Sequence, residues 1–150
     1  MNSISICCLP LFKIILNKVR VILADSNDLV RVGIRTILNS NGGFKIVGEA
    51  RDKKELLEQI KNFPATVVVI DYTSAGFDID VIPKITALDK NVKILAITPE
   101  QSAQTLVDAL RSGVISYVKK DCDLGEIINA VEETGRGHKF FCGKILETIQ

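Results

Sequence analysis

Residues 66–71 read Thr-Val-Val-Val-Ile-Asp, a β-branched run that ends on a carboxylate. A nearly continuous run of Val and Ile is typical of a strand in a parallel sheet, where helices cover both faces. Four further short runs on either side of it also predict strands. The five expected strands cover residues 19–24, 45–48, 66–70, 92–97 and 114–118.

The segments between these runs have the apolar spacing of amphipathic helices. Asp52 followed by Glu55 matches a capping box, and Asp123 with Glu126 repeats that pattern before the last helix. Gly113 stands where a helix end favours a residue with positive φ. The last helix is expected to bury one stripe: Leu124, Ile127, Ile128 and Val131.

Alternating strands and helices predict an α/β fold with a doubly wound parallel sheet, because right-handed crossovers place helices on both faces. In such sheets the working crevice lies at the carboxyl ends of the strands. Four polar side chains follow or end the predicted strands and are expected to share this rim: Asp25, Asp71, Thr98 and Lys120.

These four residue types together indicate phosphoryl chemistry. Two neighbouring carboxylates repel unless a cation lies between them, and carboxylates with backbone carbonyls suit Mg²⁺. A carboxylate beside Mg²⁺ can attack a phosphoryl group, while an ammonium neutralises charge and a hydroxyl binds a phosphoryl oxygen. Each residue alone also fits an ordinary structural role as a helix cap, a turn residue or a solvated charge.

Composition excludes several classes of function. The 150 residues are 47% hydrophobic and 25% charged, which is typical of one globular domain. A net charge of +1 gives no bulk electrostatic argument for nucleic-acid binding, and a single His excludes multi-His zinc sites. Cys7, Cys8, Cys122 and Cys142 form no C-x-x-C pair, so we expect a reducing, cytoplasmic location with Cys122 as inert packing.

The two ends are expected to lie outside the domain. Residues 1–18 are apolar but too short and interrupted for a membrane span, and they lack the features of a secretory signal. We interpret them as an N-terminal extension; a short helix for a membrane surface or a partner is the alternative. Residues 136–150 predict a tail, or a loop before the start of a linker helix, with His138 as a tail residue rather than a catalytic base.

Residues 19–135 resemble the receiver domain of bacterial two-component response regulators. The resemblance rests on VRVILAD, VVVID, ILAIT and ISYVKKD, whose key residues stand 46, 27 and 22 positions apart. The segments LVRVGIRTIL, IVGEA, ALRSGVISYVKKD and LGEIINAVEETGRG are most similar to the NarL/FixJ (LuxR-type) subfamily. This resemblance implies a flavodoxin-like (CheY-like) doubly wound five-stranded parallel sheet, with strand order 2-1-3-4-5.

The resemblance also implies roles for individual residues. Asp71 is the implied phosphoryl acceptor from a sensor histidine kinase, and Asp25, Asp71 and the Thr73 backbone carbonyl are the implied Mg²⁺ ligands. Lys120 would pair with the acyl phosphate.

Thr98 would be the switch hydroxyl, and Tyr117 the aromatic residue that changes burial as this hydroxyl moves. Lys119, next to Lys120, is expected to face solvent.

This chain departs from the family pattern around the expected metal site. Ser26 replaces the usual second acidic residue after the first strand, which should weaken Mg²⁺ binding; Asn27 replaces a common His. Asp28 is expected mainly to cap the first helix. The loop Ser-Ala-Gly at 74–76 lacks the usual Pro, so the site is expected to be less preorganised.

The interpretation is therefore a signalling receiver rather than an enzyme, controlling a transcription output domain that lies beyond these 150 residues. DNA would be reached only through a missing C-terminal helix-turn-helix domain, and a homodimer is a further expected partner. One alternative is a degenerate receiver that binds proteins without phosphorylation. A flavodoxin-like enzyme or mononucleotide binder is disfavoured, because residues 25–28 form an acidic turn without a Gly-rich phosphate cradle.

Overall fold

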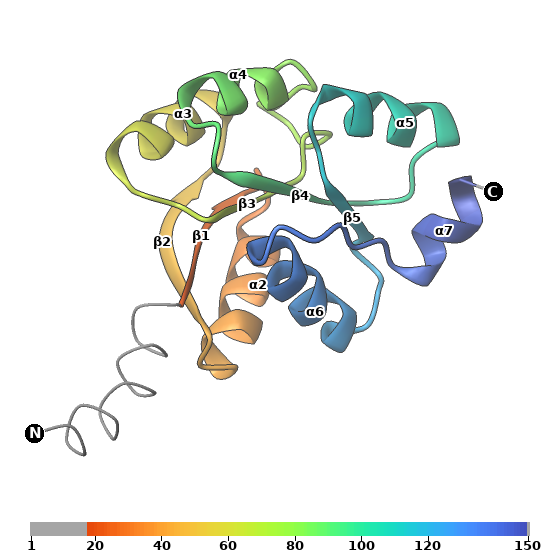
Figure 1. The fold of residues 1–150 in the computed structure, drawn as a ribbon, viewed down its shortest axis with the longest axis horizontal. Helices are drawn as coiled ribbons and strands as arrows, with labels where there is room; N and C mark the ends of the chain where they lie inside the picture. Colours follow the sequence, from red (N-terminus) through yellow and green to blue (C-terminus); the bar gives the residue numbers. More distant parts are fainter. Residues whose placement is uncertain (1–17, 150) are drawn as a thin grey trace, which may run out of the picture.

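The computed structural model describes residues 18–149. The N-terminal extension expected over residues 1–18 lies, apart from Lys18, outside the described residues. The described part forms a three-layer α/β structure around one five-stranded sheet (Figure 1).

Every strand pair in the sheet is parallel, and the order is β2-β1-β3-β4-β5. The predicted fold class and strand order are therefore confirmed. The strands begin or end one to two residues away from several predicted limits. They are β1 Val19–Ala24, β2 Phe44–Ala50, β3 Val67–Ile70, β4 Lys93–Thr98 and β5 Ser116–Lys119. All four residues of β3 are buried, as its apolar sequence requires.

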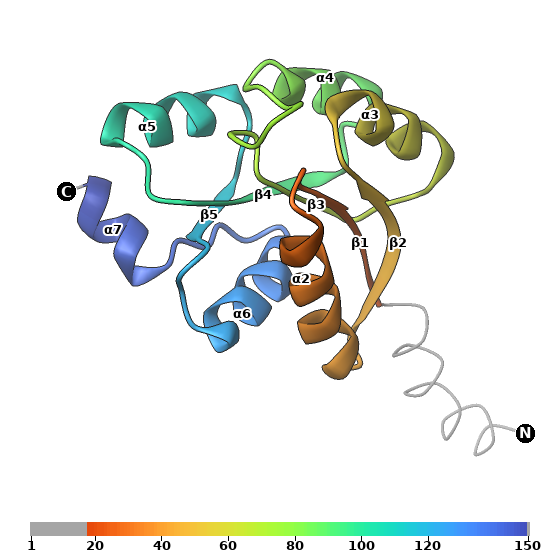
Figure 2. The same ribbon diagram turned by 180° about the vertical axis from the view of Figure 1, so that it is seen from behind.

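Helices cover both faces of the sheet (Figures 1 and 2). Helices α2 and α6 pack together on one face, whereas α3, α4 and α5 form a row on the other. Helix α7 lies apart from both layers, against β5 and α5. The helices are α2 Asp28–Ser40, α3 Lys53–Asn62, α4 Val81–Leu88, α5 Ala103–Ser112, α6 Leu124–Gly135 and α7 Gly143–Ile149.

Two predicted helix boundaries are confirmed by their hydrogen bonds. The side chain of Asp52 accepts a hydrogen bond from the backbone N–H of Glu55 at 2.9 Å and so caps α3. The Glu55 carboxylate bonds the N–H of Arg51, one residue before the position that a capping box predicts. Gly113 ends α5 with φ +125°, a conformation that a side chain would strain.

Two expectations about the start of α6 are wrong. Asp123 holds the N-cap position, but its side chain makes no capping hydrogen bond. Leu124 is 59% exposed, so the buried stripe of α6 begins at Ile127. The helix turns Leu124 away from the sheet, and its periodic spacing alone did not reveal where the buried stripe starts.

The start of α2 also differs from its prediction. Asn27, not Asp28, is the N-cap, and its Oδ1 accepts a hydrogen bond from Val30 N at 3.1 Å. Asp28 is instead the first helical residue and forms an ion pair with Arg31. An acidic residue in the first turn still interacts favourably with the helix dipole.

The C-terminal residues pair with the free edge of the sheet. Tyr117 N donates a hydrogen bond to Phe140 O at 2.9 Å, and Tyr117 and Phe141 form a parallel bridge. Ile145 of α7 is 1% exposed and belongs to the core. Among the helices of residues 18–149, none has the length and apolar character that a membrane crossing requires.

Candidate functional site

The carboxyl ends of β1 and β3 bring two aspartates together. Asp25 and Asp71 each follow their strand directly, and both are buried, at 4% and 3% exposure. Asp71 N donates to Ala24 O at 2.9 Å, which continues the ladder between the two strands. Strands β1 and β3 flank the point where the strand order reverses, which is where open α/β sheets place their binding crevice.

Lys120 bridges the two carboxylates. Its Nζ lies 2.9 Å from Asp25 Oδ2 and 2.7 Å from Asp71 Oδ2. Lys120 N donates to Thr98 O at 2.9 Å, which fixes the backbone from which the side chain extends. Burial by itself lowers the pKa of Lys120, but the hydrogen bonds that its ammonium donates to Asp71 and Asp25, with the attraction of their charges, outweigh this effect and raise the pKa. The ammonium thus stays charged and offsets the repulsion between the two aspartates.

The second oxygen of Asp71 is held by the following loop. Asp71 Oδ1 accepts hydrogen bonds from Thr73 N at 2.9 Å and from Thr73 Oγ1 at 2.5 Å. Within residues 18–149, no hydrogen bond uses the Thr73 carbonyl oxygen. That oxygen therefore remains available as a metal ligand, the role that the family resemblance implies for it.

Ser74 stiffens the loop that lacks the expected Pro. Its Oγ donates to Asp71 O at 2.8 Å and accepts from Ser26 N at 3.2 Å. One hydroxyl thus ties the loop after β3 to the loop after β1. These bonds offset part of the flexibility expected from residues 74–76.

Arg31 is a site residue that the sequence reasoning missed. It is 9% exposed, and its Nη1 donates to Asp25 O at 2.5 Å. Its Nε also lies 3.3 Å from Glu49 Oε1, so the guanidinium joins α2, β2 and the loop of Asp25. A weak signal for it is visible in the sequence, since Arg31 interrupts an otherwise apolar helix stripe.

Thr98 and Tyr117 form a separate buried network rather than joining the carboxylates. Thr98 Oγ1 donates to Pro99 O at 2.8 Å and lies 2.8 Å from the Tyr117 hydroxyl. The Tyr117 hydroxyl in turn lies 2.8 Å from that of Tyr72. Because each hydroxyl has one proton, Tyr72 donates to Tyr117 and Tyr117 donates to Thr98.

Tyr72 was not predicted, although it directly follows Asp71 in the chain. Its ring meets that of Tyr117 edge-on, with centroids 6.2 Å apart. Burial raises the pKa of both phenols, so both remain protonated at neutral pH. The network therefore links the residue beside the predicted phosphoacceptor to β5.

The prediction that Lys119 faces solvent is wrong. Lys119 is 7% exposed, and its Nζ lies 3.1 Å from Glu100 Oε1. Its aliphatic stem is buried while the ammonium reaches an exposed carboxylate. The two adjacent lysines thus point to different groups, and only Lys120 contacts the aspartates.

The donor set fits Mg²⁺. Two buried carboxylates and a carbonyl oxygen without a hydrogen bond are hard oxygen ligands, which Mg²⁺ prefers together with several waters. Asp28 does not supply the missing carboxylate, because its side chain is 80% exposed and pairs with Arg31. The site thus has one carboxylate fewer than the family pattern.

Comparison with known proteins identifies the family of the chain. The family model described as "Response regulator receiver domain" matches residues 21–132. The Fimbriae Z protein of Salmonella typhimurium is 28% identical over 130 residues, which cover 86% of this chain and 62% of that protein. The probable transcriptional regulatory protein NarL of Mycobacterium tuberculosis is 31% identical over 80% of this chain and 56% of its own length.

A solved structure gives the same result. The LuxR-family two-component response regulator from Aurantimonas sp. superposes with a TM-score of 0.81 at 28% identity, covering 87% of this chain and 94% of that one. The chain spans about 60% of the length of the first curated relatives it matches. With this fold and this family match, the chain belongs to the response regulator receiver domains, among relatives of the NarL and LuxR families.

Proposed function

We propose that this receiver accepts a phosphoryl group on Asp71 from a sensor histidine kinase. The observation that carries the proposal is the pair of buried carboxylates, Asp25 and Asp71, bridged by Lys120 at the strand-order reversal. A surface network would not require the burial of two carboxylates. Receiver domains are signalling domains, and we propose no turnover beyond self-phosphorylation and loss of the phosphoryl group.

The chain's own residues supply most of what the transfer needs. A carboxylate oxygen of Asp71 attacks the phosphorus in line with the leaving imidazole of a phosphohistidine. Lys120 then pairs with a phosphoryl oxygen, and Asp25, Asp71 and the Thr73 carbonyl would hold Mg²⁺. The metal, when bound, neutralises charge on the phosphoryl oxygens.

Thr98 and Tyr117 would pass the change to the surface. A phosphoryl oxygen near Lys120 attracts the Thr98 hydroxyl, which now donates to Pro99 O. Moving this hydroxyl breaks its bond with Tyr117, and the Tyr72–Tyr117–Thr98 chain must then rearrange. The surface formed by α5, β5 and α6 would change as a result.

The wider role follows from the relatives. The curated relative NarL is named a probable transcriptional regulatory protein. We propose that residues 19–135 form the receiver of such a regulator in the cytoplasm. DNA would be bound through a C-terminal helix-turn-helix domain, and a homodimer is a further proposed partner.

A degenerate receiver is the second candidate, and one observation favours it. Ser26 offers no carboxylate, and Asp28 pairs with Arg31 rather than facing the aspartates. If Mg²⁺ binds too weakly, the Lys120 bridge alone would keep the domain in one state, as an interaction module.

The test is intact-mass measurement after incubation with a small phosphodonor, with and without Mg²⁺. The proposal predicts one phosphoryl adduct that requires Mg²⁺ and disappears in Asp71→Asn. Asp28→Asn is the matched control, because its carboxylate is also near the rim but 80% exposed, and it should keep the adduct. If no adduct forms even at high Mg²⁺, the degenerate receiver is the correct function.

A further inference from the structure

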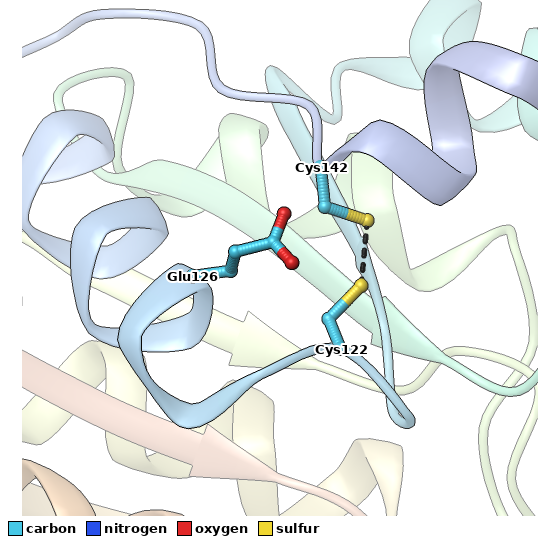
Figure 3. Close-up of side chains that lie close together, drawn as sticks. All are labelled: Cys122, Glu126 and Cys142. Carbon is cyan, nitrogen blue, oxygen red and sulfur yellow. Dashed lines mark hydrogen bonds between the residues drawn. The ribbon is translucent and has the colours of Figure 1, made fainter.

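Two cysteines meet between α6 and the C-terminal segment (Figure 3). The Sγ atoms of Cys122 and Cys142 lie 2.8 Å apart, and both residues are buried, at 6% and 1% exposure. Cys122 follows β5, whereas Cys142 immediately precedes α7. The carboxylate of Glu126 on α6 reaches toward both sulfurs, and the three ligand atoms lie within 4.8 Å of one another. The structure thus places Cys142 against Cys122, a partner that the sequence did not reveal.

The chain immediately around Cys142 is held by long hydrogen bonds and an exposed ion pair. Cys142 N donates to Tyr117 O at 3.4 Å, and Gly143 N donates to Glu126 Oε2 at 3.4 Å. Lys144 Nζ lies 3.0 Å from Asp121 Oδ2 in an exposed ion pair. Long hydrogen bonds and exposed ion pairs are weak, so residues 142–144 can open locally while Phe140 and Ile145 on either side stay docked.

The distance between the sulfurs distinguishes a zinc site from a disulfide. Two thiolates on one tetrahedral Zn²⁺, each at about 2.3 Å, would lie about 3.8 Å apart. The observed 2.8 Å is shorter, and a disulfide needs about 2.05 Å. The two cysteines are free thiols here, already closer than a shared zinc ion would place them.

We propose that Cys122 and Cys142 form a reversible disulfide that fastens the C-terminal segment to the β5–α6 turn. The oxidant is a small-molecule disulfide. The thiolate of Cys142 attacks one of its sulfurs, its S–S bond breaks, and one small thiol leaves. The thiolate of Cys122 then attacks the mixed disulfide at Cys142, and the second small thiol leaves. Two protein thiols are oxidised, the small disulfide is reduced, and the two protons end on the two released thiols.

The docked segment controls this reaction. Burial, with the hydrogen bond to Cys142, raises the pKa of the Cys122 thiol to about 12. A protonated, buried thiol reacts slowly, so oxidation starts when the segment opens and water reaches the pair. Redocking then returns the two sulfurs to contact, 2.8 Å apart, from which the bond can form.

The Cys122–Cys142 disulfide would connect the redox state of the protein to Tyr117 on β5. Residues 140–142 pair with Tyr117, so a disulfide at Cys142 keeps them on the strand that carries this tyrosine. This consequence rests on the proposed function, whereas formation of the bond does not.

The experiment uses the full chain, reduced and then equilibrated in buffers of reduced and oxidised glutathione. After the free thiols are alkylated, trypsin cuts after Lys120, Arg136, Lys139 and Lys144. The proposal predicts a linked product of residues 121–136 and 140–144 that disappears on reduction. It also predicts that oxidation raises the melting temperature by roughly 6–12 °C and slows cleavage after Lys139.

Other results would overturn the proposal. One is that both Cys122 and Cys142 of the folded chain are still alkylated, and so remain reduced, in a buffer that oxidises the urea-unfolded chain to disulfides. Another is linkage of either cysteine only to Cys7 or Cys8. A third is native mass spectra in which one Zn²⁺ is retained with all thiols reduced. Cys142→Ser should abolish both the linked peptide and the thermal shift, and a shift that persists in this variant would also contradict the proposal. All of these readouts are independent of Asp71, so a failed phosphorylation test leaves them interpretable.

Discussion

The rim at the carboxyl ends of the strands and the free edge of β5 are built in different ways. At the rim, Asp25, Asp71 and Lys120 come from residues that directly follow three strands, and parallel topology brings them together. At the edge of β5, residues 140–149 return from beyond α6 and pack against Tyr117 and α5. Strand order brings the three charged residues of the rim together, whereas the edge depends on contacts that a distant segment makes.

The largest loss of stability is expected from a substitution that breaks the packing at the β5 edge. Ile145→Ala removes a side chain that is 1% exposed and should cost about 2–4 kcal/mol of unfolding free energy. Leu146→Ala, at 46% exposure, is the matched control and should cost about 0.5 kcal/mol or less. Urea unfolding measures both; equal costs would show that α7 does not dock on the domain.

The next effect concerns the rim. Lys120→Met leaves two buried carboxylates without their cation and should cost about 1–3 kcal/mol, less than a fully buried pair because the Lys120 side chain is 24% exposed. Lys119→Met is the control, since Lys119 pairs with an exposed Glu100, and should cost under about 1 kcal/mol. Added Mg²⁺ should raise the unfolding free energy of Lys120→Met more than that of Lys119→Met.

Alkaline pH removes the charge of Lys120 and so tests the same ion pairs at the rim. Because folding raises the pKa of Lys120, the contribution of this residue to stability is complete below the pKa of lysine in the unfolded chain, about 10.4. It is lost as the pH rises through the higher folded value. The unfolding free energies of wild type and Lys120→Met should therefore differ by a constant amount near neutral pH and converge in strong alkali. If the difference instead vanishes near pH 7, the pairing of Lys120 with the aspartates is contradicted.

A smaller effect is expected at the position that departs from the family pattern. Ser26→Asp restores a carboxylate beside Asp25 and should tighten Mg²⁺ binding about tenfold, or 1.4 kcal/mol. Ser40→Asp adds the same charge at the far end of α2 and should leave the affinity unchanged. Titration calorimetry measures both, and equal affinities in Ser26→Asp and wild type would show that the existing ligands suffice.

The smallest effect compares the starts of two helices, α2 at the rim and α6 near the cysteine pair. Asn27→Ala removes a capping hydrogen bond and should cost about 1 kcal/mol. Asp123→Ala removes a side chain that makes no such bond and should cost under about 0.5 kcal/mol. The ranking would be wrong if thermal unfolding showed the Asp123 variant to be the less stable one.

The sequence predicted the parts of the molecule that depend on local pattern and topology. Apolar runs predicted five strands, and alternation with helices predicted where Asp25, Asp71 and Lys120 meet. Lys120 rather than Lys119 was correctly placed beside the aspartates, because the family motif fixes its position relative to β5.

The misses share a physical cause, since they depend on tertiary contacts. Arg31 enters the rim because α2 packs beside β2, and Lys119 lies in a fully buried strand from which its ammonium reaches the exposed Glu100. Cys142 meets Cys122 across a reversal of the chain that no short spacing encodes.

Helix starts were misjudged for a related reason. Asn27 and Asp28 are both good capping residues, and only the backbone conformation at Asn27 decides between them.

The central claim is that Asp71 is the residue that carries the phosphoryl group. Its most direct test is borohydride trapping after incubation with a phosphodonor and Mg²⁺, because borohydride reduces an acyl phosphate to an alcohol that peptide mass spectrometry can locate. We expect reduction at Asp71 alone, dependent on both donor and Mg²⁺. Reduction at Asp25 or Asp28 instead, or an unmodified Asp71 under these conditions, would contradict it.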